Sequence, residues 1–152
     1  MLKLKRIFSL MLVMVLAFSL AGCDFVYEHS AKKFMANKFN VSLRKAELVD
    51  NFYEWGFDGI IRYHALRVKD GFENELGDEW LAGPIPAEAR NVCEASSVIN
   101  GEKVINFPAV RNGFYYYEYY RNGEDKRVYL VVLDTLNDML YVFFASGHAV
   151  RR

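Results

Sequence analysis

The stretch from Gly113 to Ala145, GFYYYEYYRNGEDKRVYLVVLDTLNDMLYVFFA, decides the fold. It contains three runs of β-branched and aromatic residues, 113–121, 127–133 and 139–145, separated by two short turn sequences. Such turns force neighbouring strands to pair antiparallel, so we predict a three-stranded β-meander. Alternate residues of the middle run point to opposite faces, and both sets are apolar: Val128, Leu130 and Val132 against Tyr129, Val131 and Leu133. The middle strand should therefore be central and covered on both sides.

Upstream, the pattern predicts a helix, a strand and a short second helix. Residues 27–40 carry apolar side chains on one helical face, and Asn40 helps to end this helix. Residues 60–68 form a strand, preceded by a bend or tight turn between Gly56 and Gly59. Residues 70–86 form a loop, Pro86 opens a short helix, and Asn100-Gly101 indicates a small hairpin over 98–105. The order predicts an α+β domain whose N-terminal helix packs on an antiparallel sheet ending in the meander.

The N-terminus has the composition of an export signal. Lys3, Lys5 and Arg6 precede residues 7–20, which are uncharged and largely apolar. A membrane-spanning helix needs about 20 apolar residues, and this run is shorter. A retained signal anchor remains a second, weaker interpretation.

The end of that run, Leu20-Ala21-Gly22-Cys23, resembles the lipobox of bacterial lipoproteins. The resemblance implies that the Cys23 thiol receives a diacylglyceryl group and that the chain is cut just before it. Residues 1–22 would then be a signal peptide, and residues 23–152 a single domain on the extracytoplasmic side of the cell membrane. Each buried CH₂ contributes about 0.8 kcal/mol, so two acyl chains hold a protein firmly. The alternative is an ordinary secretory signal followed by an unrelated cysteine.

The mature domain carries a second, looser resemblance. Residues 55–59, 80–86, 113–116 and 130–141 are similar to motifs in a group of small bacterial lipoproteins of uncharacterised function. This resemblance implies the same fold and the same location. It implies no activity.

Charge and cysteine content restrict the classes of partner. Residues 23–152 hold 16 Lys and Arg residues against 19 Asp and Glu residues, a net charge of −3. This balance argues against a nucleic-acid partner and against binding anionic lipid through a basic patch. If Cys23 carries lipid, Cys93 has no cysteine partner within the chain. Cys93 is then either buried and inert or available for a bond between molecules.

The tyrosine-rich strand suggests a binding surface. Tyr115, Tyr117 and Tyr119 share one face, while Phe114, Tyr116, Glu118 and Tyr120 share the other. Exposed aromatic side chains often mark contact surfaces, so Tyr115, Tyr117 and Tyr119, together with Trp55 and Tyr63, are our candidate surface. The alternative is cross-strand packing with hydroxyl groups at the edge.

Catalytic and metal-binding signals are weak. His29, His64 and His148 are scattered, and Glu54 and Asp58 could at most form a carboxylate pair beside His64. The acidic residues of 70–79 do not have the spacing of a calcium-binding EF-hand loop. We therefore predict that the protein is not an enzyme and that it uses no metal or other cofactor.

These observations predict a membrane-anchored, non-enzymatic protein-interaction domain at the cell envelope. The alternative is a lipoprotein that binds a small ligand or a glycan. A third hypothesis is an enzyme that uses Glu54 or Asp58 with His64. A pocket that holds Trp55, Tyr63 and Tyr117 would favour a ligand, and a flat exposed tyrosine face would favour a protein partner.

Overall fold

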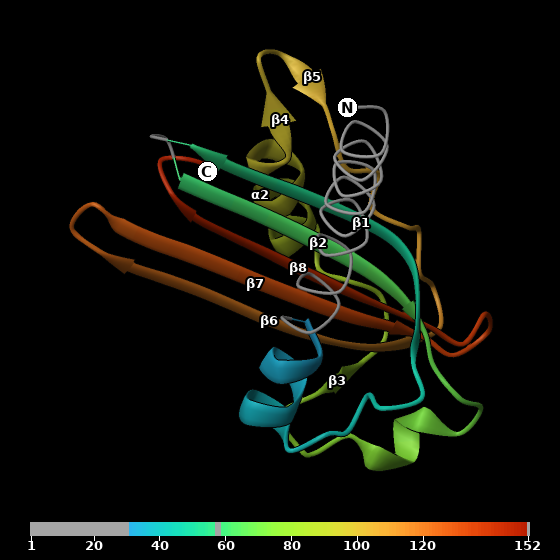
Figure 1. The fold of residues 1–152 in the computed structure, drawn as a ribbon. Coiled ribbons are helices and arrows are strands. Elements are labelled where there is room, and N and C mark those ends of the chain that lie inside the picture. Colours follow the sequence, from blue (N-terminus) through green and yellow to red (C-terminus); the bar gives the residue numbers. More distant parts are fainter. Residues whose placement is uncertain (1–30, 57–58, 152) are drawn as a thin grey trace, which may run out of the picture.

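The computed structural model describes residues 31–56 and 59–151, which form an α+β domain around one six-stranded antiparallel sheet (Figure 1). The strand order is β1-β2-β8-β7-β6-β3. The strands are β1 (Glu47–Gly56), β2 (Gly59–Arg67), β3 (Leu81–Ala82), β6 (Gly113–Asn122), β7 (Asp125–Asp134) and β8 (Met139–Gly147). The predicted fold class is confirmed.

Strands β6, β7 and β8 form the predicted meander, with β7 between its two neighbours. Each strand is slightly longer than the sequence indicated, and the β6–β7 turn closes at the pair Asn122 and Asp125. At the β7–β8 turn, the Asp134 carboxylate accepts hydrogen bonds from the Leu136 amide at 3.1 Å and the Asn137 side chain at 2.7 Å. These local bonds stabilise the tight reversal that the pattern of turn residues predicted.

Strand β1 was not predicted. It pairs along the whole of β2 and has a bulge between Leu48 and Asp50. β1 is an edge strand whose side chains are mostly exposed or half-buried, so it lacks the continuous apolar run of a central strand. Gly56 and Gly59 are the last pair of the β1–β2 ladder, so the chain reverses between them, while residues 57 and 58 of the expected turn lie outside the described residues.

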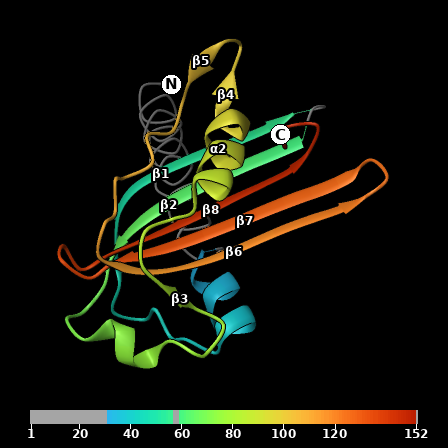
Figure 2. The same ribbon diagram turned by 180° about the vertical axis from the view of Figure 1, so that it is seen from behind.

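One face of the sheet is covered by helix α2 (Ala87–Ser96) and the small hairpin β4 (Val98–Ile99) and β5 (Glu102–Lys103) (Figure 2). Val92 and Cys93 of α2 belong to the same buried cluster as Leu130 and Phe143. Asn100 and Gly101 have φ values of 51° and 85°, as the predicted type I′ turn requires. Burial raises the pKa of the Cys93 thiol well above its usual range, which leaves the thiol protonated and inert.

In the described part of the chain, the opposite face is covered over its middle and at the end beside the β7–β8 turn. Residues 31–39 are helical, Asn40 ends the helix with φ 54°, and the part of the predicted helix before residue 31 lies outside the described residues. Met35 and Phe39 pack with Leu133 and Leu140, beside Trp80 and the 3-10 helix η1 (Phe72–Glu75). Leu133 and Leu140 lie close to the β7–β8 turn, whereas residues 31–39 cross the middle of the sheet (Figure 1). Among residues 31–56 and 59–151, none covers the other end of this face, toward the β6–β7 turn, and we call it the open end.

Candidate binding surface at the open end of the sheet

Two rows of side chains cross five strands at the open end. The inner row consists of Tyr53, Arg62, Phe144, Tyr129 and Glu118, on β1, β2, β8, β7 and β6. The outer row, two residues further along each strand, consists of Trp55, Ile60, Ser146, Arg127 and Tyr120. Because paired residues of neighbouring strands point to the same side, each row forms a continuous band across the sheet.

The inner row is held by contacts between rings and a cation. The Arg62 guanidinium carbon lies 5.5 Å from the centre of the Tyr53 ring and 5.9 Å from the centre of the Phe144 ring. The Phe144 and Tyr129 ring centres are 4.7 Å apart, and Phe34 stacks on Tyr129 at 5.2 Å. The cation–π and ring contacts hold these side chains in place against one another.

A small polar cluster marks the border between the open end and the covering helix. Lys38 forms an ion pair with Glu118, and the Tyr116 hydroxyl donates a hydrogen bond to the same carboxylate at 2.6 Å. Donation by Lys38, and then by Tyr116, holds the pKa of Glu118 below its usual range. The Lys38 ammonium also lies 5.4 Å from the centre of the Tyr129 ring. The cluster therefore connects residues 31–39 to β6 at the end of the inner row.

The outer row offers large side chains to solvent. Trp55 is 73% exposed and Tyr120 is 44% exposed, which is unusual for residues of this size on a sheet face. Arg127 donates two hydrogen bonds to Asp125, at 3.1 and 2.8 Å, and lies 5.9 Å from the centre of the Tyr120 ring. Trp, Tyr and Arg are the residues that most often dominate the energetics of protein interfaces.

A small cavity of about 130 Å³ opens beside the inner row. Its lining consists of Ala31, Phe34, Arg62, His64, Tyr129, Val142 and Phe144. The Arg62 Nε and His64 Nδ1 atoms are buried and have no hydrogen-bond partner among the described residues. Burial, and then the charge of Arg62, lowers the pKa of His64 to about 4, so this imidazole is neutral near pH 7. The cavity thus has mainly apolar walls, and two of its lining residues, Arg62 and His64, each hold a buried nitrogen atom without a partner among the described residues. A cavity of roughly 150 Å³ is known to hold one benzene ring.

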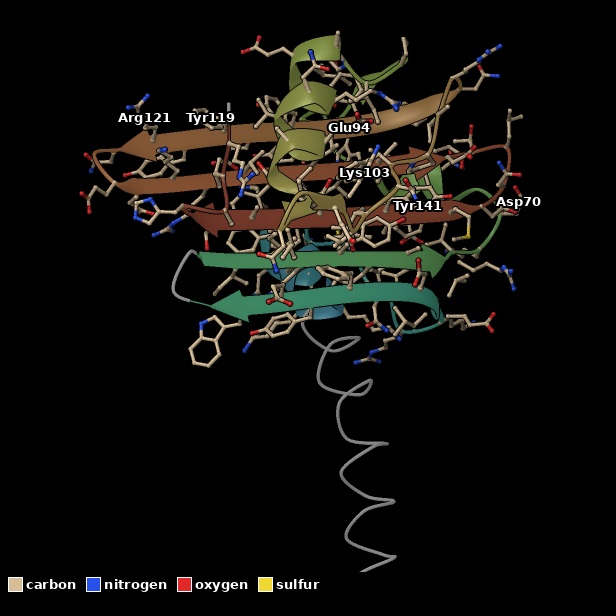
Figure 3. The ribbon with its side chains drawn as sticks, turned by 90° about the horizontal axis from the view of Figure 1, so that it is seen from above. Asp70, Glu94, Lys103, Tyr119, Arg121 and Tyr141 are labelled. Carbon is tan, nitrogen blue, oxygen red and sulfur yellow. The ribbon has the colours of Figure 1, made fainter. Side chains whose placement is uncertain are left out.

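The five residues of the predicted surface do not share a face. Trp55 belongs to the outer row, whereas Tyr63, Tyr115, Tyr117 and Tyr119 point to the face that α2 covers. Tyr63 is only 6% exposed and packs against Phe107 and Tyr141, because it lies in a central part of the sheet. Figure 3 looks onto the α2 side and shows Tyr119 near the β6–β7 turn, far from Asp70 at the other end. The structure therefore corrects the grouping: of these five residues, Trp55 alone contributes to the open end.

The hypothetical catalytic pair of Glu54 and His64 is not formed. Glu54 pairs with Ile61 and points to the α2 side, whereas His64 points to the opposite face. Asp58 and His29 lie outside the described residues. Glu54 instead lines a separate, more polar cleft of about 670 Å³ with His148 and Arg151. Within residues 31–56 and 59–151, no three potential metal ligands come together.

The sequence did not indicate most of the open end. Arg62, Tyr53, Tyr129 and Phe144 lie on four different strands, and each looks like ordinary strand composition in its own segment. One residue of the sequence gave a signal. Arg62 is a cation in the run from Gly59 to Leu66, whose other residues, apart from His64, are apolar or aromatic. A charged residue in such a run requires a partner, an exit to solvent or a function.

Comparison of the chain with protein-family models, with curated proteins and with solved structures finds no match. In the described part of the chain, no helix is long and apolar enough to cross a bilayer. The class defined by the fold and the surface is thus an α+β domain with one sheet face that the described residues cover incompletely. The two resemblances to lipoproteins stay predictions.

Proposed function

We propose that the protein is a lipid-anchored domain on the extracytoplasmic side of the cell membrane that binds a protein partner without catalysis. The anchor is the acyl group expected on Cys23. The contact surface is the open end of the sheet. The observation that supports this contact surface is the exposure of Trp55. The side chain is 73% exposed on a paired strand, in the same outer row as Arg127 and Tyr120.

The open end has the chemistry of an interface centre. Its rings and guanidinium groups are already positioned by the ladder and by the contacts within the inner row, so binding orders few side chains. The adjoining cavity can accept one apolar or aromatic side chain of the partner. Such an anchor side chain would bring its own backbone or terminal carboxylate oxygen close to Arg62.

A second candidate is a small-ligand protein, and the unpartnered Arg62 Nε and His64 Nδ1 atoms favour it. A ring-sized carboxylic acid would place its apolar body between Phe34, Tyr129 and Phe144 and its oxygen atoms toward Arg62. Benzoate titration of the purified protein, followed by ligand-observed NMR, separates the candidates. Saturable binding that Arg62→Met abolishes supports the small ligand, and its absence leaves the protein partner.

The partner is tested by photo-crosslinking in living cells. A photoreactive amino acid replaces Trp55 in one variant and Leu136 in the control, because Leu136 is 71% exposed but lies in the β7–β8 turn. We expect position 55, and not position 136, to crosslink to one envelope protein. Equal crosslinking at both positions, or none at position 55, contradicts a partner at the open end.

The anchor is tested separately by Cys23→Ala. We expect this variant to leave the membrane fraction or to keep its signal peptide, because no thiol is available for acylation. Mass spectrometry of the native protein should show cleavage before Cys23 and the mass of acyl chains. An unmodified terminal thiol contradicts the anchor and leaves the contact surface untouched.

A further inference from the structure

Positive charge is concentrated in one segment of the mature chain, residues 31–46. Residues 31–46 hold five Lys and Arg residues and no Asp or Glu. Residues 47–152 hold 11 Lys and Arg residues against 17 Asp and Glu residues, a net charge of −6, and residues 23–30 add Asp24 and Glu28 with no Lys or Arg. The net charge of −3 therefore conceals a basic segment, and a basic lipid-binding patch can exist locally in an acidic domain.

The fold turns this segment into a continuous basic surface. Val41 and Leu43 are buried in the core at the covered end of the sheet. Because these two side chains point inward, Ser42, Arg44 and Lys45 point toward solvent. Arg44 shares one surface groove with Lys32 and Lys33, and it shares the next with Lys45. We call Lys32, Lys33, Arg44 and Lys45 the basic end.

The other nearby cations are already paired. Lys38 is bound to Glu118, and Lys69, at the rim of the second groove, is bound to Glu75. Lys32 donates a hydrogen bond to the Ala46 carbonyl oxygen at 3.0 Å, which fixes its ammonium group beside the 40–46 loop. Lys33, Arg44 and Lys45 are exposed and form no ion pair within the described residues. Among the described residues, therefore, no carboxylate neutralises Lys33, Arg44 and Lys45.

Chain length places the basic end beside the bilayer. Cys23 and Lys32 are nine residues apart. A fully extended chain spans at most about 3.6 Å per residue, so the two residues cannot be more than roughly 32 Å apart. If Cys23 carries acyl chains buried in the membrane, the basic end cannot be far from the lipid headgroups, whose anionic members attract Lys and Arg near the surface.

We propose that the basic end binds the anionic headgroups of the bilayer and so fixes the orientation of the domain on the membrane. This inference rests on the proposed acylation of Cys23, which brings the two surfaces together. The lipid supplies attachment, and the exposed cations Lys33, Arg44 and Lys45 select one of the orientations that the tether allows. The contact is electrostatic, so it requires anionic lipid and weakens as salt screens the charges.

The test uses the acylated full-length mature chain in vesicles of phosphatidylcholine alone or mixed with phosphatidylglycerol. A fluorophore is attached at Ser42→Cys in the basic end or, as a control, at Asn100→Cys in the β4–β5 turn. Cys93 is fully buried, so only the introduced thiol reacts. We expect a quencher on the headgroups to quench position 42 more strongly in the anionic vesicles, and to lose that excess at high salt. Quenching that is equal at positions 42 and 100, or independent of anionic lipid, overturns the proposal.

Charge variants sharpen the result. Lys33→Gln/Arg44→Gln/Lys45→Gln removes three charges from the basic end, whereas Lys103→Gln/Arg111→Gln/Arg121→Gln removes three exposed charges elsewhere. Each triple variant carries the Ser42→Cys label, and near-UV circular dichroism establishes that both are folded. We expect the first to lose the excess quenching and the second to keep it. Equal effects of the two triples contradict a specific basic surface.

The same vesicles distinguish failure of this inference from failure of the anchor. A chain that does not sediment with phosphatidylcholine vesicles lacks a working lipid anchor, whatever its charges do. A chain that sediments with both kinds of vesicle but shows no dependence on anionic lipid at position 42 is anchored without using the basic end.

Discussion

The two ends of one sheet face differ in what covers them and therefore in what they are made of. At the covered end, Leu66, Leu140, Leu133 and Phe114 form a row across β2, β8, β7 and β6 beneath residues 31–46 and η1. At the open end, the matching rows consist of aromatic rings, Arg62 and Arg127. The strands are the same, so the cover and not the strand decides the composition. Large aromatic residues that persist without a cover indicate a contact surface.

The largest expected difference between the ends comes from truncating matched aliphatic residues. Leu140→Ala removes a side chain that is 0% exposed and should cost about 3 kcal/mol of unfolding free energy, because it leaves a cavity that the packed surroundings cannot fill. Ile60→Ala in the half-buried outer row should cost about 1 kcal/mol or less. Urea denaturation of both variants measures the difference. Similar losses would mean that the open end is packed as tightly as the covered end.

The next effect concerns His64, which lies between the two ends. Its pKa is about 4 in the folded protein against an ordinary value of 6.5, because burial disfavours the charged imidazole. Above pH 6.5 neither state holds the proton. As the pH falls from 6.5 toward 4, the unfolded state binds a proton that the folded state does not, so the free energy of unfolding decreases and then levels off. The total loss is bounded at roughly 3 kcal/mol.

Replacing His64 isolates this contribution. His64→Leu should remove most of the decrease in stability between pH 6.5 and 4, while His148→Leu, at an exposed position, should retain it. The measurement is a series of urea midpoints across that range. An unchanged pH slope in His64→Leu is incompatible with a buried neutral imidazole.

The β6–β7 hairpin gives a smaller comparison, because it begins at the covered end and turns at the open end. A Cβ atom on Gly113 would lie 1.9 Å from the Leu133 carbonyl oxygen, so Gly113→Ala forces the two strands apart. A Cβ atom on Gly123 meets nothing within 4 Å, although its φ of 61° disfavours other residues. We expect Gly113→Ala to lower the free energy of unfolding by about 2 kcal/mol, by analogy with overpacking of a core. Gly123→Ala should lower it by about 1 kcal/mol. Thermal or urea unfolding ranks the two variants, and the reverse order contradicts the register.

The meander was predictable because its signals are local. The apolar residues of 127–133 alternate over both faces, and Gly123 and Asp134 occur where a chain reverses. The edge strand β1 was not predictable in this way, since its side chains are mostly solvated and a bulge interrupts its alternation. The separation of charge in residues 31–46 was visible in the sequence, but an overall net charge averages it away.

The candidate surface could not be predicted because it depends on strand register. Trp55 pairs with Ile60, and Ile60 and Tyr63 are three residues apart on the same strand, so Trp55 and Tyr63 point to opposite faces. A turn with one residue more or fewer would place them on the same face, because the side-chain period of a strand is two. The residue types therefore suggested a single aromatic surface, but the strand register places these residues on two opposite faces of the sheet.

The smallest expected effect lies at the border, where Glu118 connects Lys38 of the covering helix to Tyr116 and the inner row. Both members of the ion pair are partly exposed, so Glu118→Gln should cost less than about 1 kcal/mol at low salt and still less at high salt. The lowered pKa of Glu118 means that any contribution is present above the ordinary carboxyl pKa and is lost as the solution is acidified through the folded value. Glu47→Gln, which breaks the more exposed pair with Arg67, is the matched control and should change nothing measurable. Urea midpoints at two salt concentrations measure both variants. A loss of stability as large as that of Leu140→Ala would show that the open end is joined to the core through this carboxylate. The two ends would then unfold as one strongly coupled unit.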